Sequence, residues 1–244
     1  MYKKFSNLYD ELVFDIDYEF YLSNIKNILN DYNIEKPDIL EIACGTGNLT
    51  KHLSGISNSV LAFDYSEQML NHAYNKLIDY ENVNIIKQDM NKFPYESYSF
   101  DAIITLLDVI NYIHSEEKVI DLFKNIYKGL GDGGVFIFDL NSKYKLFEVL
   151  GDNHFVYERN NIFYTWESSV DGNFIYFDLN FFVRREDGLY ERIIENQVER
   201  YYSINKIVKI LKNIGFKDIK FIDEDTGEKY IEGETQRILF SAVK

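Results

Sequence analysis

The sequence is poor in cysteine, in basic residues and in long apolar runs. Its single cysteine, Cys44, excludes an intramolecular disulfide and a cysteine-rich zinc site, which fits a reducing compartment. With 26 basic and 40 acidic residues the formal charge is −14, so the chain lacks the clustered Lys and Arg that neutralise a phosphate backbone. No apolar run is long enough to cross a bilayer, and residues 1–12 contain no uninterrupted apolar core of a signal peptide. We therefore expect a cytoplasmic protein that binds neither nucleic acid nor membrane.

The residues that are present are sufficient for a large core. The chain has 244 residues, 46% of them hydrophobic, which fits one large domain or one domain with a sizeable insertion. It contains no internal repeat, no low-complexity segment and no linker rich in proline or serine. Any insertion is thus expected to be built into the main fold.

A short apolar strand that ends in a glycine-bearing loop lies at residues 39–50, ILEIACGTGNLT. A helical pattern follows, and this arrangement brings backbone N–H groups and the positive end of a helix close to a polar ligand. Gly45 and Gly47 accept backbone angles that side chains forbid and allow a ligand to approach the main chain. The next apolar run ends in Asp64, at roughly the 20-residue interval at which nucleotide-binding βαβ units place a ribose-binding carboxylate. The segment therefore predicts a nucleotide-binding site.

Extended and helical patterns alternate around this segment, which is typical of a mostly parallel sheet with helices on both faces. Helical patterns at residues 2–12 and 18–32 precede the sheet; the aromatic first one either covers a sheet face or folds over the ligand site as a lid. The glycine-rich residues 131–134 are predicted to form a turn. Further helices are predicted at residues 49–53, 66–78, 115–130 and 203–214, and strands at residues 39–42, 60–64, 83–87, 101–106, 135–139, 216–223 and 237–243.

Residues 152–200 interrupt this alternation. They hold three aromatic and β-branched runs, at residues 154–166, 173–184 and 189–202, separated by turn signals at residues 171–173 and 186–188. The pattern predicts an antiparallel meander. Because it lies between one βα unit and the next, we expect it at the sheet edge where open α/β sheets bind ligands.

Together these segments resemble the class I S-adenosylmethionine-dependent methyltransferases over nearly the whole chain. The resemblance lies in EIACGTGNLT, FDYSEQML, IIKQDM, FDAIITLLDVINYI and GDGGVFIFDLN. It implies an α/β fold with a doubly wound, mostly parallel seven-stranded sheet and a small antiparallel β insertion after the fifth strand. The chain looks most like the small-molecule branch of the family. The resemblance implies an S-adenosylmethionine-binding domain of residues 1–151 and 203–244, with residues 152–202 as an inserted cap.

The resemblance also assigns roles around the methionine part of S-adenosylmethionine. Ala43, Cys44, Gly45 and Gly47 would lie against it, and Glu41 would support the loop or bind the amino group. Many family members have a glycine at the position of Ala43, but alanine is small enough that we expect the loop to keep its shape. Cys44 is expected to be a small residue tolerated in the loop rather than a reactive thiol.

For the nucleoside part, the resemblance implies that Asp64 accepts hydrogen bonds from both ribose hydroxyls, which are charge-assisted. Tyr65 and Met69 would flank the adenine. Asp89 would accept a hydrogen bond from the adenine amino group while Met90 packs on the ring. Asp89 could also be a solvated loop acid, and Glu41 could be structural only.

Transfer of a methyl group from a sulfonium asks mainly for alignment of nucleophile, carbon and sulfur. Leu107 and Asp108 would face the methionine or the acceptor, and Asp108 or His114 could take a proton from a hydroxyl acceptor. The alternative interpretation of His114, a surface residue before a helix, is the one that the sequence favours. Asp108, Asp139 and Asn141 could hold a metal, but oxygen ligands alone are a weak signal, and we expect no metal.

Three other functions compete with this interpretation. A nicotinamide dehydrogenase would have G-x-G-x-x-G, but Thr50 occupies the third glycine position. A nucleic-acid methyltransferase would show a basic face and an N-P-P-Y-type tetrad, and neither is present. A non-catalytic S-adenosylmethionine-binding or sensor protein would keep every motif. We expect an enzyme, acting as a monomer or homodimer on a small-molecule methyl acceptor.

Overall fold

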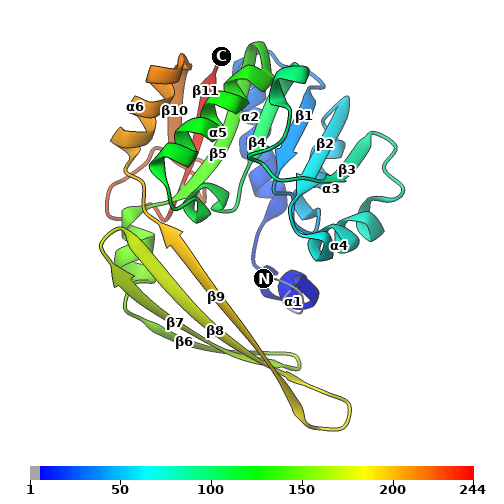
Figure 1. The fold of residues 1–244 in the computed structure, drawn as a ribbon, viewed down its shortest axis with the longest axis vertical. Helices are drawn as coiled ribbons and strands as arrows, with labels where there is room; N and C mark the ends of the chain where they lie inside the picture. Colours follow the sequence, from blue (N-terminus) through cyan, green and yellow to red (C-terminus); the bar gives the residue numbers. More distant parts are fainter. Residues whose placement is uncertain (1–5) are drawn as a thin grey trace.

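The computed structural model describes residues 6–244, which form two β-sheets (Figure 1). The larger sheet has seven strands in the order β10-β11-β5-β4-β1-β2-β3. Strands β1 to β5 run parallel, whereas β11 is antiparallel to both β5 and β10. This confirms the expected mostly parallel seven-stranded sheet. Its strands are β1 (Asp38–Ile42), β2 (Ser59–Asp64), β3 (Val83–Lys87), β4 (Phe100–Thr105), β5 (Leu130–Asn141), β10 (Lys217–Asp223) and β11 (Arg237–Val243).

Helices cover both faces of this sheet because its strands carry apolar side chains on both faces. In β1, Leu40 and Ile42 belong to the core formed with α5 and α6, whereas Ile39 belongs to the core formed with α2, α3 and α4. No helix among residues 6–244 is long and apolar enough to span a membrane. The helices are α1 (Ser6–Leu12), α2 (Tyr18–Asp31), α3 (Asn48–Ser54), α4 (Glu67–Leu77), α5 (Glu116–Gly129) and α6 (Ile204–Ile214), with short turns η1 (Tyr95–Ser97), η2 (Val109–Tyr112) and η3 (Tyr144–Val149).

Side-chain caps fix where four of these helices begin. Asp17, Ser66, Ser115 and Ser203 each accept a hydrogen bond from the backbone N–H three residues later, at the starts of α2, α4, α5 and α6. Gly215 ends α6 with a φ of +122°. The predicted helices are thus confirmed, with boundaries set by their caps. Tyr2 and Phe5 of the predicted first helix lie outside the described residues.

Two local predictions were wrong. The glycine-rich residues 131–134 are not a turn between elements but part of β5, whose pairing shifts from Phe100–Leu130 to Ala102–Val135. The extra residues bulge out of the ladder, which glycine permits. The first of the three aromatic and β-branched runs, residues 154–166, does not lie in one strand. The chain reverses at Asn160, which has a φ of +53°, so that the run is divided between two strands.

The smaller sheet is an antiparallel meander of four strands, as predicted for an inserted cap, although with one strand more. It consists of β6 (His154–Arg159), β7 (Ile162–Asp171), β8 (Phe174–Arg184) and β9 (Tyr190–Arg200). Figure 1 shows it extending away from the larger sheet, beyond the carboxyl end of β5. One face is apolar: Phe177 and Phe181 of β8 form a third core with Leu8 of α1, Met69 of α4 and Leu146 of η3.

Candidate functional site

A cavity of about 480 Å³ lies at the carboxyl ends of the parallel strands. Its floor is the loop that follows β1 and the ends of β2 and β4. Residues from α1 form one wall, and the apolar face of the cap forms another. Ligands of open α/β sheets bind at this edge. The cavity is therefore the candidate site.

The glycine loop is held open toward this cavity. Ala43 has a φ of +59° and Gly45 a φ of +56°, and both residues line the cavity. The backbone N–H of Gly45 donates to Asp64 Oδ2 at 3.0 Å. A Cβ built on Gly45 would have no atom within 4 Å. The loop thus leaves room for a ligand against its main chain.

The structure places Gly47 differently from its expected position against the methionine. Gly47 has a φ of +79° and precedes α3. A Cβ on Gly47 would lie 2.7 Å from Leu77 Cδ1 and 3.1 Å from Ala73 Cβ, both on α4. It is not among the residues that line the cavity. Gly47 therefore permits close packing of the loop on a helix.

Asp64 ends β2 with its carboxylate fixed toward the cavity. Ser66 N–H donates to Oδ1 at 2.7 Å, and Gly45 N–H donates to Oδ2. Burial raises the pKa of Asp64, although these backbone donors oppose the rise. Tyr65 and Met69 also line the cavity; Tyr65 is 75% exposed, whereas Met69 is buried.

Glu41 presents a buried and incompletely bonded carboxylate to the cavity. Its side chain is 3% exposed, and Oε2 has no hydrogen-bond partner among the described residues. Burial, reinforced by the nearby charge of Asp64, raises the pKa of Glu41 to about 8. An amino group is the kind of ligand that would supply the missing donor. Cys44 is buried as well, and burial raises the pKa of its thiol, which leaves it unreactive.

The segment after β3 only partly agrees with its expected role. Met90 lines the cavity, and so does Gln88, which the sequence interpretation missed. Asp89 itself is not among the lining residues. Its Oδ1 accepts hydrogen bonds from Asn91 N–H at 2.9 Å and from Asn91 Nδ2 at 3.0 Å, and the first of these lowers the pKa of Asp89.

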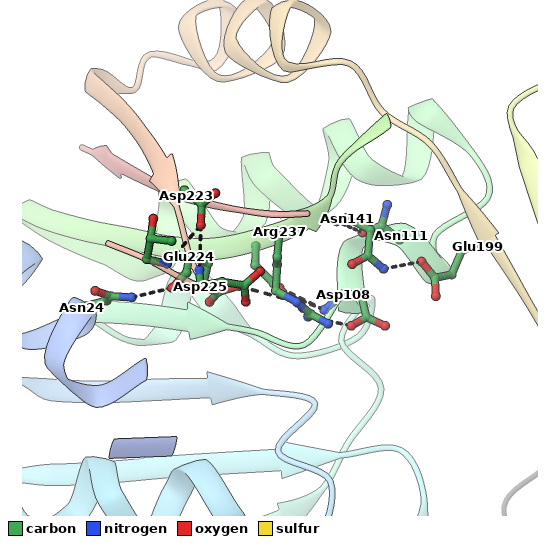
Figure 2. A network of polar contacts seen from close by, with 11 residues as sticks. Asn24, Asp108, Asn111, Asn141, Glu199, Asp223, Glu224, Asp225 and Arg237 are labelled. Atoms are coloured by element: carbon green, nitrogen blue, oxygen red, sulfur yellow. Dashed lines mark hydrogen bonds and ion pairs between the residues drawn. The ribbon is translucent and has the colours of Figure 1, made fainter. Parts of the chain in front are cut away.

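Leu107 and Asp108, after β4, adopt left-handed backbone angles with φ of +65° and +59°. Such angles are costly for residues with side chains and persist where surrounding contacts enforce them. Here Asp108 N–H donates to both oxygens of Asp139 at 3.0 and 3.1 Å, and Asp108 Oδ1 lies 2.7 Å from Arg237 Nη1 (Figure 2). Both residues line the cavity, as expected, but the Asp108 carboxylate is already paired.

Arg237, at the start of β11, organises this charged cluster. Its Nη1 also lies 2.5 Å from Asp139 Oδ2, and its Nε lies 3.8 Å from Glu224 Oε2. Burial lowers the pKa of Arg237, but Asp108 and Asp139 outweigh this and raise it. Sequence reasoning missed Arg237 because it is 129 residues from Asp108. No group of three or more His, Cys, Asp or Glu within residues 6–244 is arranged to hold a metal ion.

A second polar group lies where the cap meets the larger sheet. Asn141 at the end of β5 donates from Nδ2 to Glu199 Oε2 on β9 at 2.7 Å (Figure 2). Asn141 and Glu199 are 2% and 5% exposed, and both line the cavity with Lys145 and Gln197. Burial, reinforced by the charge of Asp108, raises the pKa of Glu199 to about 8. No motif in the sequence marks Glu199 as a site residue.

His114 lies outside this arrangement. Its ring is exposed, and Nε2 lies 2.8 Å from the carbonyl oxygen of Val198, so that this nitrogen acts as the donor. His114 does not line the cavity. The structure thus places it in the surface position that was the alternative interpretation.

Helix α1 lies over the glycine loop. Asp10 accepts a hydrogen bond from Thr46 Oγ1 at 2.6 Å and pairs with Lys76 Nζ at 2.7 Å. Tyr9 and Leu12 line the cavity. The helix therefore covers the ligand site rather than a face of the larger sheet; its opening as a lid stays a prediction.

The cap contributes an aromatic wall. Trp166 of β7 and Phe177 of β8 line the cavity, and their rings meet edge to face with centroids 5.5 Å apart. Trp166 Nε1 is buried without a hydrogen-bond partner among the described residues. Two other tyrosines of the predicted insertion, Tyr176 and Tyr201, do not line the cavity; Tyr176 is 40% exposed, and Tyr201 packs on Phe147.

Comparison with known proteins identifies the class that this fold and site define. Residues 39–134 match a family model described as a methyltransferase domain. The chain is 30% identical to YqeM of Bacillus subtilis (strain 168), a protein provisionally named as a methyltransferase, over 100% of this chain and 97% of that protein. The chain belongs to the class I S-adenosylmethionine-dependent methyltransferases. It is an enzyme whose cofactor is S-adenosylmethionine.

Solved structures agree with this assignment. A crystal structure of an S-adenosylmethionine-dependent methyltransferase from Clostridium acetobutylicum ATCC 824 superposes with a TM-score of 0.89 at 34% identity, covering 99% of this chain and 98% of that one. S-adenosylmethionine-bound CalS10, an amino pentose methyltransferase from Micromonospora echinaspora, gives a TM-score of 0.75 at 14% identity over 93% and 92%. The second likeness shows a shared fold alone.

Proposed function

We propose that this enzyme transfers the methyl group of S-adenosylmethionine to a small-molecule acceptor held between the glycine loop and the cap. The observation that carries the proposal is that one cavity, of about 480 Å³, joins the glycine loop to the aromatic wall of the cap. Small-molecule sites have this size and this mixture of apolar walls with a few polar groups. The net charge of −14 also disfavours a nucleic-acid acceptor.

The residues around the glycine loop fit the cofactor. Glu41 offers a buried acceptor to its amino group, and Gly45 leaves space against the main chain. The Asp64 carboxylate stands at the strand end where a ribose binds. Met69 and Met90 supply apolar surface for the adenine. Asp89 Oδ1 already accepts two hydrogen bonds from Asn91, which leaves Oδ2 for an adenine amino group.

Catalysis in this proposal rests mainly on positioning. The cofactor supplies a methyl group that its sulfonium already activates, so alignment with the acceptor accounts for most of the acceleration. Arg237 and Asp139 hold Asp108 and the strained loop beside the cavity, which makes Asp108 a positioning residue. We treat residues 152–202 as the acceptor-binding cap and residues 1–151 with 203–244 as the cofactor-binding domain.

The first prediction concerns Asp64. Replacing Asp64 by Ala should weaken S-adenosylmethionine binding by about 1.5–3 kcal/mol, the range for hydrogen bonds to a charged group. Isothermal titration calorimetry measures this, with Asp132→Ala as the control because Asp132 is exposed and does not line the cavity. Unchanged affinity in the Asp64 variant would remove Asp64 from the cofactor site.

Methyl transfer itself is tested with methyl-labelled S-adenosylmethionine. We expect label to enter a low-molecular-weight metabolite extract and not RNA, DNA or protein fractions. Incorporation into one of the macromolecular fractions alone would overturn the small-molecule assignment.

A further inference from the structure

Strand β9 buries two of its charged residues and exposes an apolar one. Glu195 and Glu199 are 7% and 5% exposed, whereas Ile194, on the opposite face of the strand, is 54% exposed. Packing alone would favour the reverse, because burying a carboxylate is costly and burying isoleucine is favourable. Gln197 lies between the two acids on the same face and lines the cavity with Glu199. At Glu199, which lines the cavity, the buried charge points to a ligand with polar requirements.

Two hydrogen-bond acceptors at this place lack donors. Asn141 Nδ2 donates a hydrogen bond to Glu199 Oε2. Asn141 Oδ1 is buried and has no hydrogen-bond partner among the described residues. Only one oxygen of Glu199 has a hydrogen-bond partner within residues 6–244. The backbone N–H of Asn141 also donates to Asn111 Oδ1 at 3.0 Å, which fixes the main chain at the end of β5. The fixed pair thus offers acceptor atoms from two side chains to one ligand.

Acidic side chains outnumber basic ones around the pair. Four carboxylates line the cavity, those of Glu41, Asp64, Asp108 and Glu199, against two cationic side chains, those of Lys145 and Arg237. Arg237 is already bound to Asp108 and Asp139. No ion pair joins Lys145 to Glu199 among the described residues, and burial together with Arg237 lowers the pKa of Lys145. Glu199 therefore faces the cavity without a bound cation.

Resting on the function proposed above, we propose that the methyl acceptor is an amine, bound through its nitrogen by Glu199 and Asn141 beside the aromatic wall of the cap. An ammonium group has donors for both side chains and a charge that compensates Glu199. A hydroxyl has one donor and no charge, so it satisfies only one of the two. A carboxylate has no donor and is repelled.

The pair also provides for the proton that an ammonium must lose before it can act as a nucleophile. The bound ammonium first expels the proton that Glu199 holds in the free enzyme. One ammonium proton then passes to the resulting carboxylate, which leaves a neutral amine with a free electron pair. A carbon–nitrogen bond then forms as the carbon–sulfur bond breaks, and its electron pair stays on sulfur. The product is a methylated ammonium, and the proton on Glu199 leaves to solvent. The pKa of Glu199, about 8, makes this transfer less unfavourable than it would be to an ordinary carboxylate.

The test compares amines with alcohols and acids of similar size and skeleton, using protein saturated with S-adenosylhomocysteine. The probes are 2-phenylethylamine, 2-phenylethanol and 3-phenylpropionate, and glucosamine, glucose and glucuronate. Calorimetry should show at least one amine binding tenfold or more tightly than its matched alcohol and acid. Glu199→Gln should reduce this preference to less than threefold.

Glu195→Gln is the matched control, because Glu195 is a buried carboxylate on the same face of β9 but does not line the cavity. It should retain the amine preference, and thermal unfolding checks that both variants fold. Titration at pH 7 in buffers of different ionisation enthalpy gives a second readout. Glu199 is surrounded by the charges of Asp108, Lys145 and Arg237, and binding of an ammonium should release a proton in the wild type but not in Glu199→Gln.

The outcomes separate the two proposals. Failure of the wild-type protein to bind S-adenosylhomocysteine would overturn the proposed function. Binding of S-adenosylhomocysteine with no amine preference in either series, or with a preference that survives Glu199→Gln, would overturn the amine assignment alone.

Discussion

Glu41 and Glu199 each present a buried carboxylate to the cavity, the first from β1 and the second from β9. Both have a pKa raised to about 8, mainly because burial disfavours the charged form. In a protein selected for stability alone these positions would favour apolar residues. They are the kind of site that a ligand with amino groups would complete.

The raised pKa of Glu41 predicts a pH-dependent stability. Because the folded state holds this proton more tightly than the unfolded chain, whose value is 4.5, the stability is complete below pH 4.5 and is lost as the pH rises through about 8. The slope is at most about 1.4 kcal/mol per pH unit. The unfolding free energy of the ligand-free wild type should fall relative to Glu41→Gln between pH 5 and 8.

Urea unfolding at several pH values measures this difference. Glu35→Gln, at an exposed position, is the control and should follow the wild type. Parallel pH profiles for the wild type and Glu41→Gln would mean that Glu41 is not the group responsible.

At the scale of elements, Gly45 and Gly47 of the same loop face different surroundings. A side chain at Gly45 would point into open space, whereas one at Gly47 would collide with Leu77 and Ala73 of α4. The loop thus meets a ligand at one position and a helix at the other. Strand, loop and α4 form one packed unit, with Asp64 tied to Gly45 across it.

Gly45 and Gly47 allow a prediction in which each variant is the control for the other. Both positions have positive φ, so alanine costs about 1–2 kcal/mol of stability at each. Gly47→Ala should lose about 1–3 kcal/mol more through overpacking against α4. Gly45→Ala should instead show the larger loss of S-adenosylhomocysteine affinity. Urea unfolding and calorimetry on both variants check this, and the opposite ranking in either measurement would contradict the assignment.

At the scale of the whole molecule, the cavity exists only because three distant segments meet. Helix α1, the carboxyl edge of the larger sheet and the cap each supply part of its lining. Phe177 and Leu8 share a core, which ties the cap to α1. Cofactor and acceptor are thereby enclosed together, and closing a site in this way excludes water from the reaction.

The cap is predicted to serve the acceptor more than the cofactor. Trp166→Ala should lower turnover at least tenfold once an acceptor is known, because Trp166 forms part of the aromatic wall, while S-adenosylhomocysteine affinity should stay within about twofold. Tyr176→Ala is the control, since Tyr176 lies on the cap outside the cavity lining. Equal loss of turnover and cofactor affinity in Trp166→Ala would assign the cap to the cofactor site.

The sequence by itself determined the alternation of strands and helices, the cap insertion and the position of Asp64. All of these follow from local periodicity or from a residue at a strand end, which the chain carries within a few positions. It left undetermined where the first helix packs, and it placed a turn at residues 131–134 because glycine favours turns and bulges alike.

Only the tertiary structure decided the charged part of the site. Arg237 meets Asp139 across 98 residues, and Asn141 meets Glu199 across 58. The face on which Glu199 lies follows from the register of β9 against β8, and the partner of Gly47 follows from how α4 packs. Such pairings depend on which elements the folded core brings together, because a side chain's burial and charge environment come from neighbours that are far away in the chain.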